Sequence, residues 1–306
     1  MSIPWLLAQV PPSDTWFTVS PHWGWYIVVY FFLGGIAGGA AFLSGLLDLF
    51  GNPLDRPMTR IGYVLALVTV IIGGPLLIID LNRPERFWHM VIQSNTMMPM
   101  FKWYSPISFG VYILMAFSLF VGLAALAALG DWRVLPRTFS RLGEGTLGKL
   151  LALGCVLSGT ALAGYTGLVL TTTNRPLWGN TIWMSLLFLL SGISAGSAAM
   201  ILFGRRRGHP GTVQWLEEME RYSSIGEIIV LAIMAITLGS IAQAVWGGVW
   251  AVIMLVGVVL LGILVPLFLY YRPRTLGAAT IPVAAVLVLV GVFLLRTVVI
   301  LSSEAI

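Results

Sequence analysis

Residues 26–50 read YIVVYFFLGGIAGGAAFLSGLLDLF, a run in which Asp48 is the only charged residue. About 20 apolar residues suffice for an α-helix to cross the hydrocarbon core of a bilayer, so this run predicts a membrane-spanning helix. Small residues allow helices to pack closely in lipid, so we interpret the glycines inside the run as a packing surface rather than a phosphate-binding loop. These glycines are Gly34, Gly35, Gly38 and Gly39.

The rest of the 306-residue chain has the same character, with 58% hydrophobic and only 9% charged residues. Soluble domains contain about 25% charged residues, so this composition excludes a soluble globular domain and also a disordered chain. Seven further apolar runs are long enough to span a membrane: residues 61–79, 106–129, 148–170, 180–203, 225–245, 249–271 and 280–301. The sequence therefore predicts an all-α integral membrane protein with eight transmembrane helices.

The Lys and Arg residues predict the orientation in the membrane. Twelve of the 17 lie in or beside the loops that follow the first, third, fifth and seventh predicted helices, and five lie on the other side. Positively charged loops remain on the cytoplasmic side, so we expect both termini on the outer side. The net charge of +5 is spread over these short loops, so we expect no nucleic-acid-binding surface. The first 18 residues lack a basic segment followed by an apolar core, so we expect no cleavable signal peptide.

The chain has few residues of the kinds that bind redox centres. Its three histidines, His22, His89 and His209, lie in loops or at predicted helix ends, and Cys155 is its single cysteine. A haem held by two histidines needs them to face each other inside the helices, and iron–sulfur clusters need cysteine ligands. We therefore expect no haem, no iron–sulfur cluster and no other metal site in this chain.

Two loops on the predicted outer side share a pattern. Asn-Arg-Pro occurs at residues 82–84 and at residues 174–176, and a tryptophan follows each. Ten of the 12 tryptophans lie on this side, whereas an aromatic belt populates both membrane interfaces. Arginine presents a fixed fork of donors to carboxylates, and tryptophan is enriched at binding hot spots. We favour a docking surface for a partner protein over the alternatives, an aromatic belt or a helix stop with snorkelling arginines. The predicted docking residues are Arg83, Arg86, Trp88, Asn174, Arg175 and Trp178.

Several of the few polar groups in the predicted spans gather near the outer side, and polar residues in such segments are usually functional. A quinone needs an apolar slot open to lipid, a polar group at each carbonyl and a route for protons. The predicted quinone-binding residues are Tyr165, Tyr30, His22 and Asp80. Asp80 is also a predicted proton carrier, and we expect Arg83 and Arg86 either to keep it ionised or to bind the partner. The preceding residues 73–75, Gly-Gly-Pro, are expected to kink the helix.

Asp48 and Glu227 lie near the inner ends of the first and sixth predicted helices. We favour the interpretation that these carboxylates mark the membrane boundary. The alternative is that both transfer protons from the inner side.

These motifs resemble those of the NrfD/PsrC family, the membrane subunits of polysulfide-reductase-type complexes. The resemblance runs from residues 22–25, His-Trp-Gly-Trp, through residues 80–88, to residues 165–167, Tyr-Thr-Gly, and residues 174–178. It covers the first five predicted helices, and the last three match in hydropathy and number. It implies two four-helix bundles, one at residues 1–146 completed by the helix at 148–170, and one at residues 171–306.

The resemblance also implies a function. The first bundle is expected to bind menaquinone or ubiquinone as a substrate, with Tyr165 at a quinone carbonyl. Tyr30 stands where related proteins have a quinone-binding histidine. The implied partners are a ferredoxin-like subunit with four iron–sulfur clusters on the outer face and a molybdopterin catalytic subunit beyond it. The implied location is a bacterial or archaeal cytoplasmic membrane.

Three functions therefore compete at this point: a quinone-reactive anchor of an oxidoreductase, a secondary transporter or ion channel without a redox role, and a purely structural anchor. Transporters favour charged or broken-helix sites near the middle of the membrane. The polar groups of this sequence are predicted near the two faces, and this distribution favours the quinone-reactive anchor.

Overall fold

The computed structural model describes residues 22–81, 83–272 and 274–304. Within these ranges the chain is helical and has no β-strand, only an isolated bridge between Ile92 and Pro99. The long helices are α2 (Trp25–Phe50), α3 (Arg56–Ile79), α4 (Pro106–Asp131), α5 (Gly145–Thr171), α6 (Met184–Gly204), α7 (Pro210–Leu238) and α11 (Thr280–Glu304). A further span joins α9 (Val249–Val252), the π-helical segment η4 (Ile253–Leu264) and α10 (Val265–Tyr271). Eight spans of the described chain are long and apolar enough to cross a membrane, which confirms the predicted class and number.

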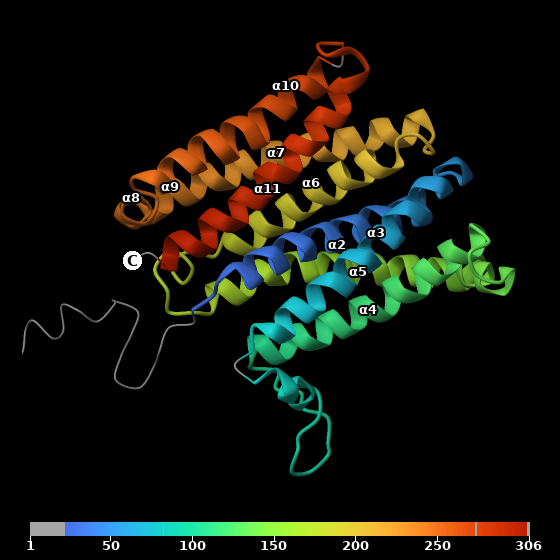
Figure 1. Ribbon diagram of the computed structural model, residues 1–306, viewed down its shortest axis with the longest axis horizontal. Coiled ribbons are helices and arrows are strands. Elements are labelled where there is room, and N and C mark those ends of the chain that lie inside the picture. The colour runs from blue at the N-terminus through green and yellow to red at the C-terminus, as the bar shows by residue number, and fades with distance from the viewer. Residues whose placement is uncertain (1–21, 82, 273, 305–306) are drawn as a thin grey trace, which may run out of the picture.

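The spans lie side by side along the long axis of the molecule (Figure 1). Helix α2 packs against α3, α5 and α6, and α4 packs against α3 and α5. Helix α6 packs against α7 and α11, and α11 packs against η4 and α10. Since α2 also contacts α11, the first four and the last four spans form one continuous body.

The buried core divides by depth along the helices. One cluster contains Ala40 of α2, Met200 of α6 and Val288 of α11. The other cluster contains Phe31 of α2 and Phe188 of α6 and lies toward the opposite end of the same helices. Each cluster thus contains residues from both sides of residue 171, and the division into two four-helix bundles stays a prediction.

Glycines set the close approach of α2 to its neighbours. A Cβ atom added to Gly38 would lie 2.7 Å from the carbonyl oxygen of Gly159 in α5. A Cβ atom added to Gly39 would overlap the carbonyl oxygen of Gly192 in α6. These contacts confirm the interpretation of the glycine cluster as a helix-packing surface.

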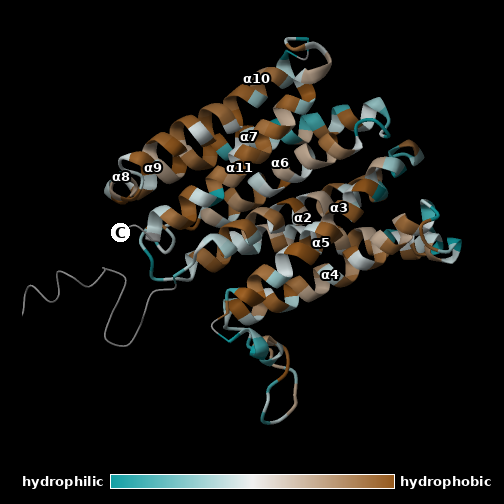
Figure 2. Ribbon diagram, viewed as in Figure 1, coloured by the Kyte–Doolittle hydropathy of each residue, from teal (hydrophilic) through white to brown (hydrophobic). Residues whose placement is uncertain are grey.

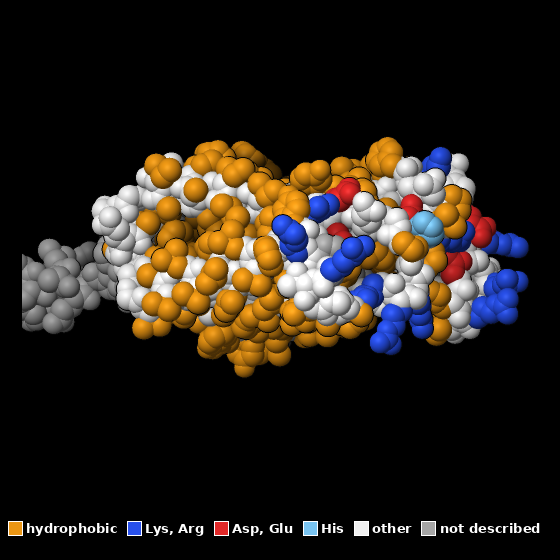
Figure 3. Space-filling view, turned by 90° about the horizontal axis from the view of Figure 1, so that it is seen from above, with side chains coloured by type: hydrophobic (Ala, Val, Ile, Leu, Met, Phe, Trp, Pro, Cys, Tyr) orange, Lys and Arg blue, Asp and Glu red, His pale blue; other side chains and the backbone are white. Residues whose placement is uncertain are grey.

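The two ends of the molecule differ in charge. We call the end formed by the connections α2–α3, α4–α5, α6–α7 and α10–α11 the basic end. Hydrophobic side chains cover the lateral surface between the ends, and Lys and Arg gather toward one end (Figures 2 and 3). Arg60, with 3% of its surface exposed, lies here and pairs with Asp131 at 2.7 Å and Asp48 at 3.3 Å. Asp48 thus helps to join α2, α3 and α4.

The sixth span differs from the sequence prediction at both ends. Helix α7 begins at Pro210 rather than at residue 225, because Pro210 occupies the first turn and the His209 ring caps it by accepting a hydrogen bond from the Gly211 amide. The charged residues of its first turns kept this segment out of the hydropathy prediction. The same helix ends at Leu238, since Gly239 has a φ of +51°, and a short helix, α8 (Ser240–Val245), follows. Glu227 therefore lies well inside the span and not near its inner end.

Candidate functional site

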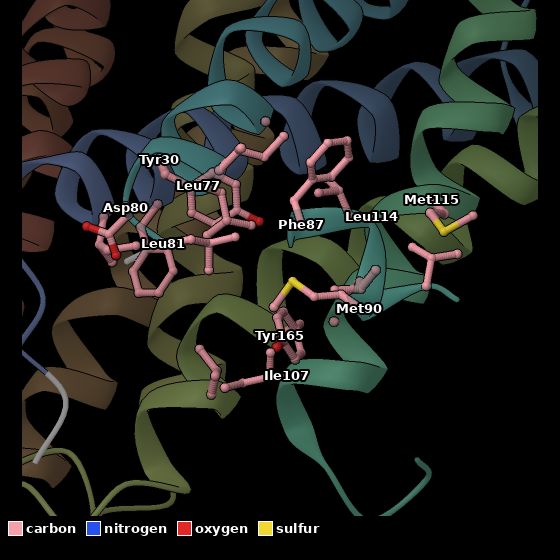
Figure 4. Close-up of a pocket in the computed structure, with 18 of the residues that line it drawn as sticks. Tyr30, Leu77, Asp80, Leu81, Phe87, Met90, Ile107, Leu114, Met115 and Tyr165 are labelled. Carbon is pink, nitrogen blue, oxygen red and sulfur yellow. The ribbon is translucent and has the colours of Figure 1, made fainter. Parts of the chain in front are cut away.

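A cavity of about 530 Å³ lies at the end opposite the basic end, between the first four spans (Figure 4). Short helix η2 (Pro84–Met90) closes one side of it. Its walls are mostly apolar. The lining residues are Trp23, Ile27, Tyr30, Phe31, Gly74, Leu77, Ile78, Asp80, Leu81, Phe87, Met90, Val91, Ile107, Gly110, Val111, Leu114, Met115, Ser118, Tyr165 and Val169.

Glycines make room for the cavity. Helix α3 continues through Pro75, and Gly74 contributes a wall without a side chain. In α4, Gly110 lies against the ring of Tyr165, and a Cβ atom there would overlap the phenol. A larger residue at position 110 would therefore displace the tyrosine that the sequence predicts to contact a quinone.

The Tyr165 hydroxyl has a fixed partner. It donates a hydrogen bond to the carbonyl oxygen of Pro106, 2.8 Å away in the first turn of α4. A carbonyl can only accept, so the hydroxyl proton points to Pro106 and the lone pairs of the phenol oxygen stay free to accept a further hydrogen bond. Tyr30 reaches the same cavity from α2 and is 5% exposed. The structure thus brings both predicted tyrosines to one cavity.

Asp80 caps the C-terminal end of α3 and also borders the cavity. Burial raises the pKa of its carboxyl group above the ordinary value. Burial is the cause of this shift, and the expectation that Arg83 and Arg86 keep Asp80 ionised stays a prediction. Arg86 faces Glu85, with its Nε atom 3.9 Å from the carboxylate.

His22 does not line the cavity. Its Nδ1 atom lies 2.9 Å from Nη2 of Arg175, in the contact between the start of α2 and the loop that follows α5. The next residue, Trp23, does line the cavity, and its ring stacks on Trp178 with 5.2 Å between the centroids. The predicted contact between His22 and a quinone therefore does not fit the structure.

Two of the predicted docking residues are buried within the chain. Trp178 is fully buried, and its Nε1 atom donates to the carbonyl oxygen of Val299 at 2.7 Å. Arg175 is 3% exposed and donates to the carbonyl oxygen of Ser303 at 3.3 Å. These contacts fasten the loop after α5 to the end of α11, which argues against direct contact of either side chain with a partner. The other four predicted docking residues are exposed at this end: Arg83, Arg86, Trp88 and Asn174.

The wall formed by α4 was not predicted from the sequence. Ile107, Val111, Leu114 and Ser118 recur at helical spacing and so share one face of this helix. Periodicity alone could have revealed that face, but an apolar stripe is equally typical of helix packing. No group of three or more His, Cys, Asp or Glu residues in the described part of the chain is placed to hold a metal ion.

Comparison with known proteins agrees with this architecture. The family model described as "Polysulphide reductase, NrfD" matches residues 18–306. Protein NrfD of Escherichia coli (strain K12) is 29% identical over 308 residues, which cover 90% of this chain and 92% of that protein. The NrfD homolog of Haemophilus influenzae is 27% identical over 305 residues, again 90% and 92% of the two proteins. A polysulfide reductase chain of Wolinella succinogenes is 29% identical over 198 residues, 60% of this protein and 58% of that one. With eight spans and a family match over nearly its whole length, this multi-pass membrane protein belongs to the polysulphide reductase NrfD family.

Proposed function

We propose that this protein is the quinone-reactive membrane subunit of a multi-subunit oxidoreductase. It exchanges electrons between the membrane quinone pool and an iron–sulfur partner subunit. The cavity carries this proposal, because an apolar space of about 530 Å³ with Tyr30, Asp80 and Tyr165 on its wall suits a quinone ring. Small-molecule sites in proteins typically have this size and this mixture of apolar wall and few polar groups. The rings of menaquinone and ubiquinone both suit such a cavity.

The polar residues have distinct roles in this proposal. Tyr165 and Tyr30 bind the two oxygen atoms of the ring. Because the Tyr165 proton is directed at Pro106, its oxygen accepts a hydrogen bond from a quinol hydroxyl, and a turn of the O–H bond lets it donate to a quinone carbonyl. Quinol oxidation releases two electrons and two protons; the electrons pass to the partner, and Asp80 accepts protons one at a time and releases them to water.

The partner contacts the same end of the molecule. Arg83, Arg86, Trp88 and Asn174 are exposed there and form the proposed docking surface. A ferredoxin-like subunit with four iron–sulfur clusters at this surface would hold a cluster close to the cavity, with a molybdopterin catalytic subunit beyond it. The name of one relative, a polysulfide reductase chain, supports a place in a multi-subunit reductase. By the distribution of Lys and Arg, this end faces the outer (periplasmic) side of a bacterial or archaeal cytoplasmic membrane, with both termini there.

Transport is the alternative that one observation favours. Glu227 and Arg296 are buried inside spans of the second half of the chain, and transporters commonly hold charged sites near the middle of the membrane. The cavity lies between the first four spans, and neither Glu227 nor Arg296 is part of its wall, which favours the quinone role. A transporter would move a solute across vesicles without any redox partner.

A variant that fills the cavity tests the proposal without altering a polar group. In Gly74→Leu the new side chain enters the cavity, where a Cβ atom meets nothing within 4 Å. The matched control is Gly122→Leu in α4, which has equal space but is not part of the wall. We expect quinone-linked turnover to be lost in Gly74→Leu alone, with full electron transfer from an artificial dye to the iron–sulfur partner. Unchanged quinone-linked turnover in Gly74→Leu would refute the proposed site.

A further inference from the structure

Residues 91–104, between η2 and α4, form a hairpin with exposed apolar side chains. An antiparallel bridge between Ile92 and Pro99 closes it, and the Met100 amide donates to the carbonyl oxygen of Val91 at 2.7 Å. These backbone contacts give the segment a defined shape, while its large side chains face outward rather than into a core. The exposed apolar residues of the hairpin, with 37–80% of their surface exposed, are Ile92, Met97, Met98, Phe101, Trp103 and Tyr104.

Apolar and polar residues are separated along the hairpin. The turn, Gln93 to Thr96, is polar, and the returning segment from Met97 to Tyr104 is apolar apart from Lys102, the only charged residue of the hairpin. A concentrated exposed apolar surface usually marks a contact with a protein or with a membrane. The position of the hairpin relative to the spans decides between these two occupants.

Hydrogen bonds fix the base of the hairpin at the depth where α4 enters the membrane. Ser108 Oγ donates to the carbonyl oxygen of Met100 at 3.2 Å and accepts from the Lys102 amide at 3.1 Å. The Tyr112 hydroxyl donates to the carbonyl oxygen of Val91 at 3.4 Å. Helix α4 has 26 residues and is therefore about 39 Å long, whereas the hydrocarbon core is about 30 Å thick. Its first turn thus lies at the boundary between lipid headgroups and acyl chains.

The apolar side of the hairpin continues the lipid-facing surface of α4. The ring of Phe101 meets the ring of Tyr112 edge to face, with 5.1 Å between the centroids. The α4 residues beside this contact recur every three or four positions and so share one face of the helix, which is not the face that borders the cavity. A shallow apolar depression between the hairpin and this face is lined by Phe101, Phe109, Tyr112, Ile113 and Ala116. Lipid that covers α4 here therefore also meets the hairpin.

The direction of the hairpin agrees with contact to lipid. Figure 1 shows it as the teal loop that leaves the bundle sideways below α4, beside the start of that helix and not beyond the end of the molecule. A surface that projects sideways at this depth meets the bilayer. The residues at its end also suit the bilayer surface, because Trp103 and Tyr104 are of the types enriched at membrane interfaces and Lys102 can extend its charge toward the headgroups.

We infer that the hairpin inserts its apolar side chains into the lipid leaflet at the cavity end and anchors the start of α4 there. Met97, Met98 and Trp103 lie among the first segments of the acyl chains, and Lys102 contacts the phosphate groups. Val91, at the base of the hairpin, lines the cavity, so contact of the hairpin with lipid also holds one edge of the cavity wall. The insertion requires neither a bound quinone nor a partner protein.

Nitroxide spin labels on the full-length chain in phospholipid vesicles test the inference. Met97→Cys and Met98→Cys each carry a label on the apolar segment, and Asn95→Cys, on the polar turn of the same hairpin, is the matched control. All three positions are exposed, so the variants should fold, and the native Cys155 is buried and should stay unlabelled. Oxygen concentrates in lipid and a water-soluble nickel chelate stays outside it, so the collisions of each with a label report the surroundings of that label.

We expect the labels at positions 97 and 98 to collide with the nickel chelate at least about tenfold less often than the label at position 95, since burial of an apolar side chain favours insertion by about this factor or more. Collisions with oxygen should be more frequent at positions 97 and 98 than at position 95. Equal access of the chelate to all three labels overturns the inference. Access that falls at positions 97 and 98 only after the complete complex is assembled also overturns it, because a partner protein and not lipid then covers the hairpin.

Discussion

The hydroxyl group of Tyr165 in α5 donates to the carbonyl oxygen of Pro106 in α4, 2.8 Å away, directly beside the cavity. This bond fixes the phenol ring against Gly110, which has no side chain to displace it. The tyrosine is thus held in place before a ligand arrives, and only its O–H bond would have to turn between the two redox states of the proposed quinone. Such preorganisation is typical of binding sites that act without large movements.

Removal of this hydroxyl should affect quinone chemistry much more than folding. Tyr165→Phe loses a hydrogen bond that contributes about 1 kcal/mol, which corresponds to about a fivefold effect on binding or rate. We expect quinone-linked turnover to fall by about this factor while dye-linked turnover is retained, with both rates measured on the same membranes. Tyr112→Phe is the control, because that hydroxyl bonds to the carbonyl oxygen of Val91 and is not part of the cavity wall. Equal losses of quinone-linked turnover in the two variants would show that Tyr165 has no special role.

The raised pKa of Asp80 predicts a pH dependence. A partly buried carboxyl group keeps its proton to a higher pH than a surface aspartate does, so Asp80 gains its proton-accepting form only as the pH rises past its raised pKa. We expect quinol oxidation to increase with pH over this interval and the increase to vanish in Asp80→Asn. The rate should be measured with quinol and, as a control, with a dye that carries no proton.

Asp80 should affect the stability of the protein in the opposite direction: stability falls with rising pH, whereas quinol oxidation increases. Because folding raises the pKa of Asp80, the native state binds more protons than the unfolded chain in this interval, and stability falls as the pH rises through it. The Asn variant should not show this fall. A thermal transition that changes with pH in the same way in both proteins would show that Asp80 is not the group responsible.

Local signals in the sequence were sufficient to predict the spans and three of the residues that line the cavity. Tyr30 and Tyr165 are polar groups four and five residues inside the outer ends of their apolar runs, and Asp80 directly follows the outer end of its run. Helices that pack side by side bring residues at equal depth together, so the shared cavity follows from depth and order alone.

Distant contacts decided the features that the sequence did not reveal. Trp178 is buried by a bond to Val299, 121 positions along the chain, and Arg175 by a bond to Ser303, 128 positions along. No local pattern distinguishes these two residues from the exposed Arg86 and Trp88 in the matching loop. Arg296 was similarly counted as a charge of the outer side, whereas the structure places it in the core against Phe188 and Ser191.

The packing of α2 against α6 makes Gly39 intolerant of any side chain. In Gly39→Leu the Cβ atom already overlaps the backbone of Gly192, and a rigid helix cannot move aside without loss of the packing around it. We expect little or no folded protein in the membrane, measured by fluorescence-detected size exclusion after extraction in mild detergent. Gly164→Ala in α5 is the control, since a Cβ atom there meets nothing within 4 Å. It should fold normally and gain about 0.5–1 kcal/mol of stability from the better helix propensity.

The two matching loops should respond differently to loss of their tryptophans. Trp178 fills the core and bonds to Val299, so Trp178→Ala should destabilise the protein by about 3–5 kcal/mol, as large-to-small changes in cores do. Trp88 is 39% exposed on η2 and belongs to the proposed docking surface, so Trp88→Ala should leave the thermal stability of the isolated protein unchanged.

Binding of the proposed iron–sulfur partner should further distinguish the Trp88 variants from the Trp178 variants. We expect Trp88→Ala, alone or with Arg86→Ala, to weaken co-purification of the partner while the protein itself stays folded and inserted. Trp178→Phe is the useful companion, because it keeps most of the buried ring and loses only the bond to Val299, and it should fold and retain the partner. If Trp88→Ala binds the partner as tightly as the unaltered protein and Trp178→Phe does not, the docking surface lies on the second loop. The contacts of Arg175 and Trp178 with α11 would then position that surface for the partner.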